Sequence, residues 1–407
     1  MATARRTATN SIALLALLLL PATAAYAGGP LLVRSNGTPY VWSTSPISYR
    51  TDDGPLSATV DEMDARGRVL EAFNVWQNVG SSNISYSRAG SINSTAGFTD
   101  GDVSTGAEYN AVLGTCNSGS QNPIIYDADG TIFTDLNIDV ESVLGFAGFC
   151  DIDASNYLSG HAVMNGLFID GQDVPVQDVP SDAFFNAVFV HEFGHFSGLD
   201  HSQINVNCQF GCAPDDFTGL PTMFPLLIPD PLVSQGNLSV DDIAWISSLY
   251  PQTGAGGFAS THGTITGTVF FSDGESHAQL VNVIARQVDT GLNQDRTTAA
   301  SVVSGYRFRI FHGNPINAAP DSFGSEAPAL IGLYEIPVPP GNYTIEVESI
   351  DPGFTGGSSV GGPIRIAMPG TAPAPIGPIN VTAGAMASGN DIVLIGTDPR
   401  FDQFEGP

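Results

Sequence analysis

The stretch HEFGHFSGLDH, residues 191–201, says more about the fold of this protein than any other part of its sequence. It contains the pattern H-E-x-x-H-x-x-G-x-x-H. On an α-helix, His191 and His195 lie about one turn apart on the same face, so both imidazoles can reach one metal ion. Gly198 can adopt the positive φ angle that ends a helix and reverses the chain. We therefore expect His201 to return to the same ion as a third ligand.

Glu192 and the number of histidines indicate the chemistry of such a site. Three neutral imidazoles leave one position of a tetrahedral Zn²⁺ ion open, whereas structural zinc is normally closed by four protein ligands. Glu192 lies about 100° around the helix from His191, beside the ion rather than on it. A carboxylate there can take a proton from water and pass it to a leaving group. The pattern predicts a hydrolytic site with one zinc ion and Glu192 as catalytic residue; a buried helix with incidental histidines is the alternative interpretation.

The residues before the histidines predict a buried helix that begins near residue 181. Ser181 is a suitable N-cap, and Asp182 suits the positive end of the helix dipole. Apolar side chains cover nearly every side of the segment: Ala183, Phe184, Phe185, Ala187, Val188, Phe189, Val190 and Phe193. A helix that is apolar all round is packed inside a protein, and such packing can hold metal ligands in fixed rotamers.

The run HEFGHFSGLDHS resembles the active-site segment of the metzincin zinc proteases, and its HEFGH-x-x-GLDHS form is particularly similar to the matrixins. Downstream, PTMFP at residues 221–225 resembles the metzincin Met-turn, whose methionine, here Met223, would lie under the zinc without binding it. Residues 238–250 resemble the matrixin C-terminal helix, in which Asp241 or Asp242 would tie the helix to the Met-turn. The resemblance implies an α+β metzincin-like domain, a twisted mixed sheet with long helices and zinc in the cleft.

Further elements upstream agree with this resemblance, which spans about residues 40 to 252 and is loose between 90 and 180. Residues 47–50 predict a first strand, and residues 84–87 predict another. Between them, residues 58–79 carry apolar side chains at helical spacings and predict a long helix.

The sequence departs from the mammalian matrixin pattern in two respects. No cysteine lies between the predicted signal cleavage and Cys116, so the cysteine-switch propeptide of matrix metalloproteinases is absent. The structural zinc of that family needs several histidines ahead of the catalytic helix, but only His161 is present there. We expect His161 to be an ordinary strand or loop residue.

An acidic segment before the catalytic helix raises the question of calcium. Asp127, Asp129 and Asp135 lie in YDADGTIFTD, and Asp-x-Asp-Gly can bind Ca²⁺. The glycine comes too early for an EF-hand loop. A solvated turn is the favoured interpretation, and Ca²⁺ is the alternative.

The first 27 residues predict export. Arg5 and Arg6 form a positive region, residues 12–20 a short apolar core, and residues 25–27 a small-x-small cleavage signature. The core is too short to span a membrane. We therefore expect a signal peptide at residues 1–27 and a secreted or periplasmic protein.

Export suits the four cysteines, because an oxidising compartment favours disulfides. Cys116, Cys150, Cys208 and Cys212 allow three pairings. We expect Cys116 to pair with Cys150 and Cys208 with Cys212; a cysteine-rich zinc site is the competing interpretation. The formal net charge of −28 argues against nucleic acid or an anionic membrane as a partner.

The 407 residues exceed what one core usually supports, so we expect two domains. A metalloprotease domain at 28–252 would be followed by a flexible linker at 253–260, rich in small residues. Residues 261–398 alternate strand-like runs with Gly and Pro turns, which predicts an antiparallel all-β sandwich. The expected strands are 264–271, 280–288, 306–311, 333–338, 342–349, 363–367, 379–382 and 392–395.

The motifs ITGTVFFSDG, VNVIARQVDTG and LYEIPVPPGNYTIEVESI resemble the carboxypeptidase regulatory-like, prealbumin-type sandwich, which implies an accessory role. The histidines of this region, His262, His277 and His312, are scattered, and we expect each at the surface. The tail at 399–407 lacks an apolar anchor.

The leading hypothesis is a secreted, monomeric zinc endopeptidase that hydrolyses proteins or peptides, with no membrane anchor. By resemblance, the chain after the Met-turn, residues 225–229, would wall the pocket for the side chain that follows the cut bond, and its apolar content favours aliphatic or aromatic side chains. The alternative is a secreted binding or adhesion protein in which the protease fold is a scaffold.

Overall fold

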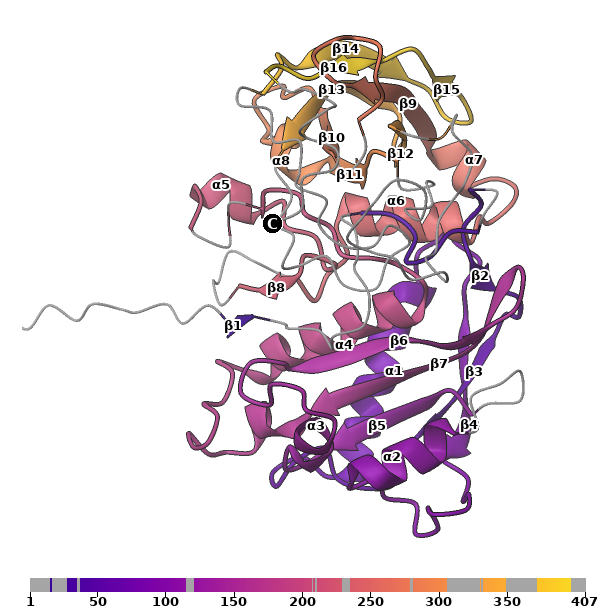
Figure 1. The fold of residues 1–407 in the computed structure, drawn as a ribbon, viewed down its shortest axis with the longest axis vertical. Helices are drawn as coiled ribbons and strands as arrows, with labels where there is room; N and C mark the ends of the chain where they lie inside the picture. Colours follow the sequence, from indigo (N-terminus) through magenta and orange to yellow (C-terminus); the bar gives the residue numbers. More distant parts are fainter. Residues whose placement is uncertain are drawn as a thin grey trace, which may run out of the picture.

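The computed structural model describes residues 15–16, 28–34, 37–114, 121–206, 208, 211–228, 235–278, 281–305, 330, 332–348 and 372–396. Figure 1 shows an N-terminal α/β part, a C-terminal β part, and the helix α6 (Val240–Leu249) between them. The predicted order, an α+β domain followed by a β domain, is confirmed.

The N-terminal part is built on a six-stranded sheet with strand order β2-β7-β5-β3-β4, in which β6 also pairs with β7. Every pairing is parallel except that between β6 and β7. The sheet is therefore mixed, as expected. Its strands are β2 (Val41–Trp42), β3 (Ile47–Thr51), β4 (Tyr86–Ser91), β5 (Pro123–Asp127), β6 (Gly145–Ile152) and β7 (Asn156–Asn165).

Two long helices pack on this sheet, and their contact forms the centre of the core. The Phe73 ring of α1 stacks on the Phe193 ring of α4 with centroids 3.9 Å apart, and it meets Tyr49 of β3 at 4.4 Å. Asp61 and Ser181 cap the two helices through their side chains. The helices of this part are α1 (Glu62–Gln77), α2 (Gly106–Leu113), α3 (Thr131–Asp135), the 3₁₀ turn η1 (Gly166–Ile169), α4 (Asp182–Phe196) and α5 (Pro214–Phe217).

The C-terminal part consists of two four-stranded sheets that share one hydrophobic core. One has the antiparallel order β11-β10-β13-β14; in the other, β9 pairs with β12, β15 and β16. The sequence predicted an antiparallel sandwich, but β15 and β16 run parallel to β9. This part of the prediction is wrong. The strands are β9 (Gly263–Phe270), β10 (Asn282–Gln287), β11 (Ala299–Val303), β12 (Leu333–Val338), β13 (Gly341–Glu348), β14 (Ile376–Val381), β15 (Met386–Ala387) and β16 (Ile392–Val393), with α8 at Gln294–Thr297.

Most predicted strands of the sandwich lie within two or three residues of an observed one, although β11 and β15 were not predicted. The predicted strands at 306–311 and 363–367, together with the tail at 399–407, lie outside the described residues. The prealbumin-type resemblance stays a prediction.

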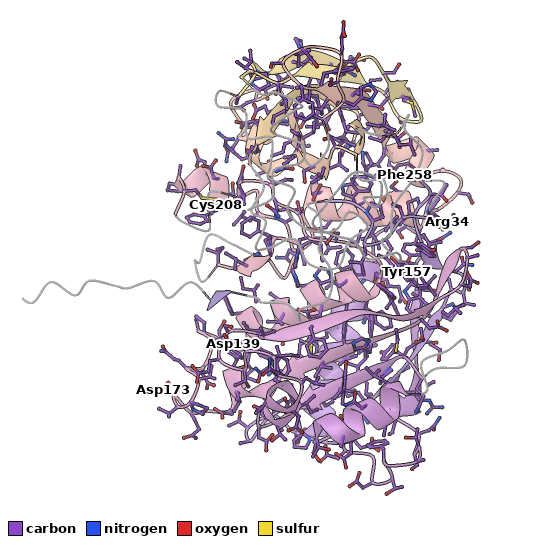
Figure 2. The ribbon with its side chains drawn as sticks, in the orientation of Figure 1. Arg34, Asp139, Tyr157, Asp173, Cys208 and Phe258 are labelled. Carbon is purple, nitrogen blue, oxygen red and sulfur yellow. A yellow bond between two sulfur atoms is a disulfide. The ribbon has the colours of Figure 1, made fainter. Side chains whose placement is uncertain are left out.

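The predicted flexible linker forms local structure instead. Residues 254–257 turn back so that Phe258 donates its N–H to Gln252, and α7 (Phe258–Thr261) follows. His262 is buried and stacks on Phe258 with ring centroids 5.2 Å apart, which corrects the expectation of a surface residue. Figure 2 labels Phe258 on the side of the sandwich. His312 lies outside the described residues.

The boundary between the two parts is bonded and packed. Trp245 of α6 donates its indole N–H to the Ser301 carbonyl of β11 at 2.8 Å, and Ser301 donates its N–H to Asp241 at 2.8 Å. Buried residues of both parts belong to one continuous hydrophobic cluster.

Most of the predicted signal peptide lies outside the described residues. Its Leu15–Ala16 segment forms strand β1, which pairs antiparallel with β8 (Leu226–Leu227). None of the helices within the described ranges combines the length and apolarity that a membrane crossing requires.

Candidate active site

Helix α4 carries the first two histidines and ends where the sequence predicts a turn. Ser181 accepts the N–H of Phe184 at its start, as expected of an N-cap. Ser197 ends the helix, and Gly198 follows with φ 93°, a conformation that side chains rarely adopt. A Cβ at Gly198 would also lie 2.8 Å from the Tyr157 ring. The reversal therefore needs glycine for two reasons.

The turn brings His201 back to the two helical histidines. The Nε2 atom of His201 lies 3.1 Å from Nε2 of His195 and 3.3 Å from Nε2 of His191. All three side chains are buried. Among the described residues, they are the one group of histidine, cysteine or acidic side chains whose ligand atoms converge within 4.8 Å.

The hydrogen bonds of the imidazoles show that this cluster suits a cation. Nδ1 of His191 donates to the Thr222 carbonyl at 2.7 Å, and Nδ1 of His195 donates to the Leu199 carbonyl at 2.8 Å. Each of these Nε2 atoms then carries a lone pair directed at His201. Lone pairs that converge without a proton between them repel, and a metal ion between them removes that repulsion. Zinc bonds of about 2.0–2.1 Å in a tetrahedron separate ligand nitrogens by about 3.3 Å, close to the spacings found here.

Burial also keeps the imidazoles in the neutral form that binds a metal. It lowers the pKa of His191 to about 3, helped by the neighbouring His195 and opposed by the hydrogen bond to Thr222. It lowers the pKa of His195 to about 4, with the bond to Leu199 opposing it. Both rings are therefore neutral ligands over the physiological pH range.

Glu192 follows the first histidine and is completely buried, with no hydrogen-bond partner on either carboxylate oxygen. Burial raises its pKa to about 8, and the nearby backbone of Ala147 in β6 opposes the rise. A cation held by the adjacent imidazoles would lower that pKa, because an opposite charge favours the carboxylate. An unpartnered buried carboxyl group beside a metal-binding cluster is free to exchange a proton with a bound molecule.

Met223, which the resemblance assigns to the Met-turn, packs against α4. A Cβ at Gly194 would come 2.2 Å from the Met223 sulfur and 2.9 Å from the Trp76 ring, so only glycine allows this approach. Asp242 accepts the N–H groups of Met223 at 3.1 Å and Thr222 at 2.9 Å. Asp242 is therefore the residue that ties α6 to the Met-turn.

Three aromatic side chains that sequence reasoning missed hold the backbone of α4. Trp76 donates its indole N–H to the Val190 carbonyl at 2.8 Å, and Trp42 donates to the Phe196 carbonyl at 2.8 Å. Tyr250 donates to the Ser197 carbonyl at 2.7 Å. Buried Trp and Tyr need partners for their polar atoms, and the free carbonyls at the end of α4 supply them for Trp42 and Tyr250. The sequence could have indicated that these side chains need hydrogen-bond partners, but it does not show which residues the partners are.

The first described residues after the predicted cleavage site lie against the active-site turn. Leu31 donates its N–H to Gly198 at 2.7 Å, and Gly29 accepts the N–H of Asp200 at 3.0 Å. Gly28 donates its N–H to the His201 carbonyl. This segment forms part of the support of the third histidine.

The other predicted residues lie away from the three histidines. His161 is half-buried beside Tyr109 and Phe146, and desolvation lowers its pKa to about 4. Asp127, at the end of β5, accepts the Phe133 N–H of α3 at 2.9 Å. Asp129 accepts the Thr131 N–H at 3.0 Å, and Asp135 accepts the Gly106 N–H at 2.9 Å. The acidic segment is therefore not the solvated turn that was expected: it runs from the end of β5 through a bend into α3, Asp127 is buried, and the three carboxylates accept backbone N–H groups.

The predicted disulfide between Cys208 and Cys212 is present. Cys150 is also disulfide-bonded, while Cys116, its predicted partner, lies outside the described residues.

A cavity of about 580 Å³ lies between α1, the N-terminal part of α4 and the segment after the Met-turn, and the three histidines are not among its lining residues. Ala187 and Val190 of the helix line it, together with Leu227 and Ile228 of the segment after the Met-turn. Pro229, also predicted to wall a pocket, lies outside the described residues.

Comparison with known proteins agrees with this geometry. The family model described as Matrixin matches residues 41–209, a span that contains β2 to β7, α4 and all three histidines and ends before Met223. A search of curated proteins finds no match. Residues 41–209 are therefore a matrixin-like metzincin domain, and the protein is a zinc metalloendopeptidase.

Proposed function

We propose that this protein is a secreted endopeptidase in which His191, His195 and His201 hold one zinc ion and Glu192 handles the proton of the attacking water. The observation that carries the proposal is the convergence of three buried Nε2 atoms beside a buried, unpartnered carboxyl group. When bound, zinc would act as a Lewis acid and lower the pKa of a coordinated water towards neutrality.

Glu192 supplies the acid–base chemistry. One of its carboxylate oxygens accepts the proton of the water that attacks the peptide carbonyl. The same oxygen then returns the proton to the leaving amine, so no covalent bond forms between enzyme and substrate. The complete burial of Glu192 limits competition from bulk water for this proton.

The segment after the Met-turn is suited to bind an extended peptide. Leu226 and Leu227 form a strand, and this strand already pairs with residues 15–16 of the chain itself. Its backbone groups can therefore hydrogen-bond a chain in the β conformation. We propose that the cavity at Ala187, Val190 and Leu227 takes an aliphatic or aromatic side chain of the substrate.

The proposed domain boundaries are those expected from the sequence, with 28–252 as the protease domain and 261–398 as the sandwich. We also propose a disulfide between Cys116 and Cys150. Secretion is supported by the predicted signal peptide and by the disulfide of Cys208 and Cys212.

The decisive variant is Glu192→Gln, which keeps the shape of the side chain but cannot accept a proton as a carboxylate does. We expect peptide hydrolysis to fall by about 10²- to 10⁴-fold while zinc content stays unchanged. Glu141→Gln, at an exposed position, is the matched control and should match the parent. Casein cleavage by Glu192→Gln at the parental rate would refute the proposal.

A further inference from the structure

The residues directly after the third histidine are held by the sandwich rather than by the protease domain alone. Ser202 lies against Ser301 of β11, with the two hydroxyl oxygens 3.3 Å apart. The Gln203 carbonyl accepts the side-chain N–H of Asn282 in β10 at 3.2 Å. Two consecutive residues after His201 thus contact two different strands of the other domain.

The next two residues continue this pattern. Ile204 is fully buried in a small apolar cluster with Ile284 of β10 and Ala299 at the start of β11. Asn205, with φ 57°, accepts the guanidinium N–H of Arg286 at 2.6 Å and donates its backbone N–H to Glu348 at 3.1 Å. All four residues from 202 to 205 therefore have a partner on the sandwich.

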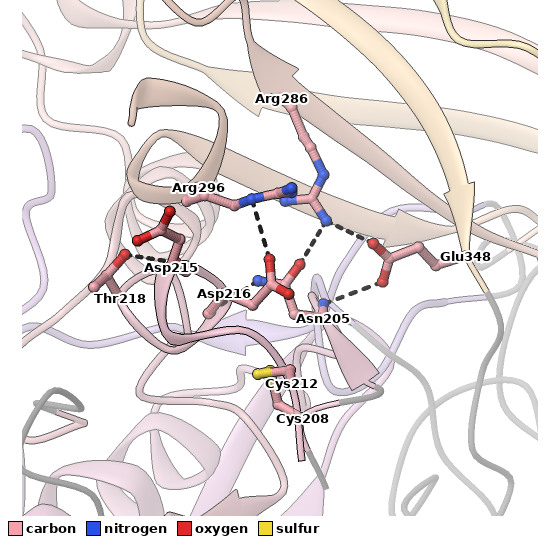
Figure 3. Close-up of a disulfide and its surroundings, with 9 residues drawn as sticks. All are labelled: Asn205, Cys208, Cys212, Asp215, Asp216, Thr218, Arg286, Arg296 and Glu348. Atoms are coloured by element: carbon pink, nitrogen blue, oxygen red, sulfur yellow. Dashed lines mark hydrogen bonds and ion pairs between the residues drawn. A yellow bond between two sulfur atoms is a disulfide. The ribbon is translucent and has the colours of Figure 1, made fainter. Parts of the chain in front are cut away.

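Arg286 is the centre of this contact. Its side chain is 2% exposed, so its charge is almost fully removed from water. It donates to Glu348 at 2.6 Å and to Glu346 at 3.1 Å, both on β13, as well as to Asn205. Figure 3 shows Arg286 and Glu348 meeting Asn205 above the disulfide. The guanidinium fork can bind several acceptors at once, which a lysine cannot reproduce.

The period of the strand explains why these side chains face the loop. Asn282, Ile284 and Arg286 alternate along β10 with Val283 and Ala285, and alternate residues of a strand point to opposite faces. Val283 and Ala285 are buried in the main core. The opposite face of β10 is covered by residues 202–205, and for this reason Arg286 on that face is buried.

A second contact holds the far side of the same loop. Arg296 of α8 forms an ion pair with Asp216 of α5 at 3.1 Å, and Gly219 packs so closely on the Arg296 carbonyl that a Cβ would lie 1.9 Å away. The disulfide of Cys208 and Cys212 lies between these contacts in sequence. The loop between His201 and the Met-turn is therefore fixed to the sandwich at both ends.

We propose that Arg286 is a positioning residue for the zinc site: by fixing Asn205, it holds the segment that carries His201, and the sandwich is a working part of the active site. This inference rests on the proposed zinc function. The supporting path is short, because Ser202 also donates its N–H to the Met223 carbonyl at 2.7 Å. Movement of residues 202–205 would thus reach both the third ligand and the Met-turn.

The test uses the full-length chain and the rate at which zinc passes to a chromophoric chelator. Asn205→Gly removes the side chain that Arg286 holds but keeps a residue that tolerates positive φ. Asn137→Gly, at an equal φ of 57° on an exposed loop, is the matched control. We expect zinc loss about tenfold faster in Asn205→Gly than in Asn137→Gly, since residues behind a ligand affect metal affinity on this scale.

Two arginine variants test the same point from the sandwich side. Arg286→Met should speed zinc loss and change the visible spectrum of the cobalt-substituted protein, and Arg286→Lys should recover part of both. Arg66→Met, which breaks an ion pair on α1, is the control. A rise in zinc loss without a matching loss of thermal stability separates positioning from general destabilisation.

The outcomes distinguish the two proposals. If the parent chain retains zinc and Asn205→Gly loses it no faster than Asn137→Gly, the positioning role is wrong and the proposed enzyme stands. If the parent chain does not retain zinc at all, the proposed function fails and this inference falls with it.

Discussion

Helix α4, which carries His191 and His195, is held by its own domain, whereas the segment after His201 is held by the sandwich. Trp76 and Trp42 bind carbonyls of the helix from α1 and β2. Arg286, by contrast, reaches the loop from a strand about 80 residues further along the chain. The three histidines thus have neighbours from two parts of the chain that the sequence assigns to separate domains.

A metal-binding motif and the residues that support it therefore need not lie in the same domain. The eleven residues of the motif place three imidazoles, but a ligand that follows a helix end needs its own anchor. Here the anchor is the outer face of β10 and β11, which sequence reasoning treated as part of an accessory module.

Deletion of the sandwich domain should have the largest effect on the zinc site. A chain of residues 28–252 would expose Ile204 and leave Asn205 without Arg286, so we expect zinc retention to fall more than about tenfold. Equilibrium dialysis followed by metal analysis measures this. A truncated, monodisperse protein with full zinc and full activity would show that the sandwich is dispensable.

A substitution inside α4 tests the other side of the site. Gly194→Ala places a Cβ against the Met223 sulfur and the Trp76 ring, and overpacking of this kind costs about 1–3 kcal/mol of unfolding free energy. Gly67→Ala on α1 meets no atom within 4 Å and should stabilise the protein by roughly 0.5–1 kcal/mol. Urea denaturation compares the two, and equal effects would contradict the close packing under the zinc site.

The stability of the sheet domain and that of the domain boundary should both depend on pH. Burial raises the pKa of Asp52 in the sheet domain, and of Asp241 at the boundary, from 3.8 to about 7. Each folded pKa lies above its unfolded value, so the stability that each group contributes is complete below about pH 4 and is lost as pH rises through 7. The free energy of unfolding should fall with a slope of up to about 1.4 kcal/mol per pH unit for each group.

Single variants show how much of the slope of unfolding free energy against pH comes from the sheet domain and how much from the domain boundary. Asp52→Asn should remove the contribution of the sheet domain, and Asp241→Asn that of the boundary. Urea denaturation between pH 4 and 8 gives the slopes; a parent protein whose stability rises over this range would contradict both assignments.

Much of the protease half could be predicted from the sequence because its signals are local. The Ser181 cap, the apolar helix and Gly198 each act within a few residues, and the Met-turn follows at the expected place. α6 begins within two residues of the prediction, with Ser239 and Asp242 forming a capping box.

The support of His201 could not be predicted, for physical reasons that particular residues illustrate. A charged residue such as Arg286 is normally solvated, so its burial depends on partners distant in sequence. The strand β11, with the sequence AASVV, is short and has no polar alternation to mark it. His262 was expected at the surface because residues 253–260 read as a flexible linker, whereas the turn of α7 places Phe258, four residues earlier, against it.

The most direct test of the account is metal analysis of the purified full-length protein together with a peptide-hydrolysis assay. We expect one zinc ion per chain, loss of zinc and of hydrolysis together on treatment with a chelator, and recovery of both when zinc is returned. His201→Ala should retain neither. Hydrolysis that persists in fully zinc-free protein, or a parent chain that binds no zinc, would contradict the central claim.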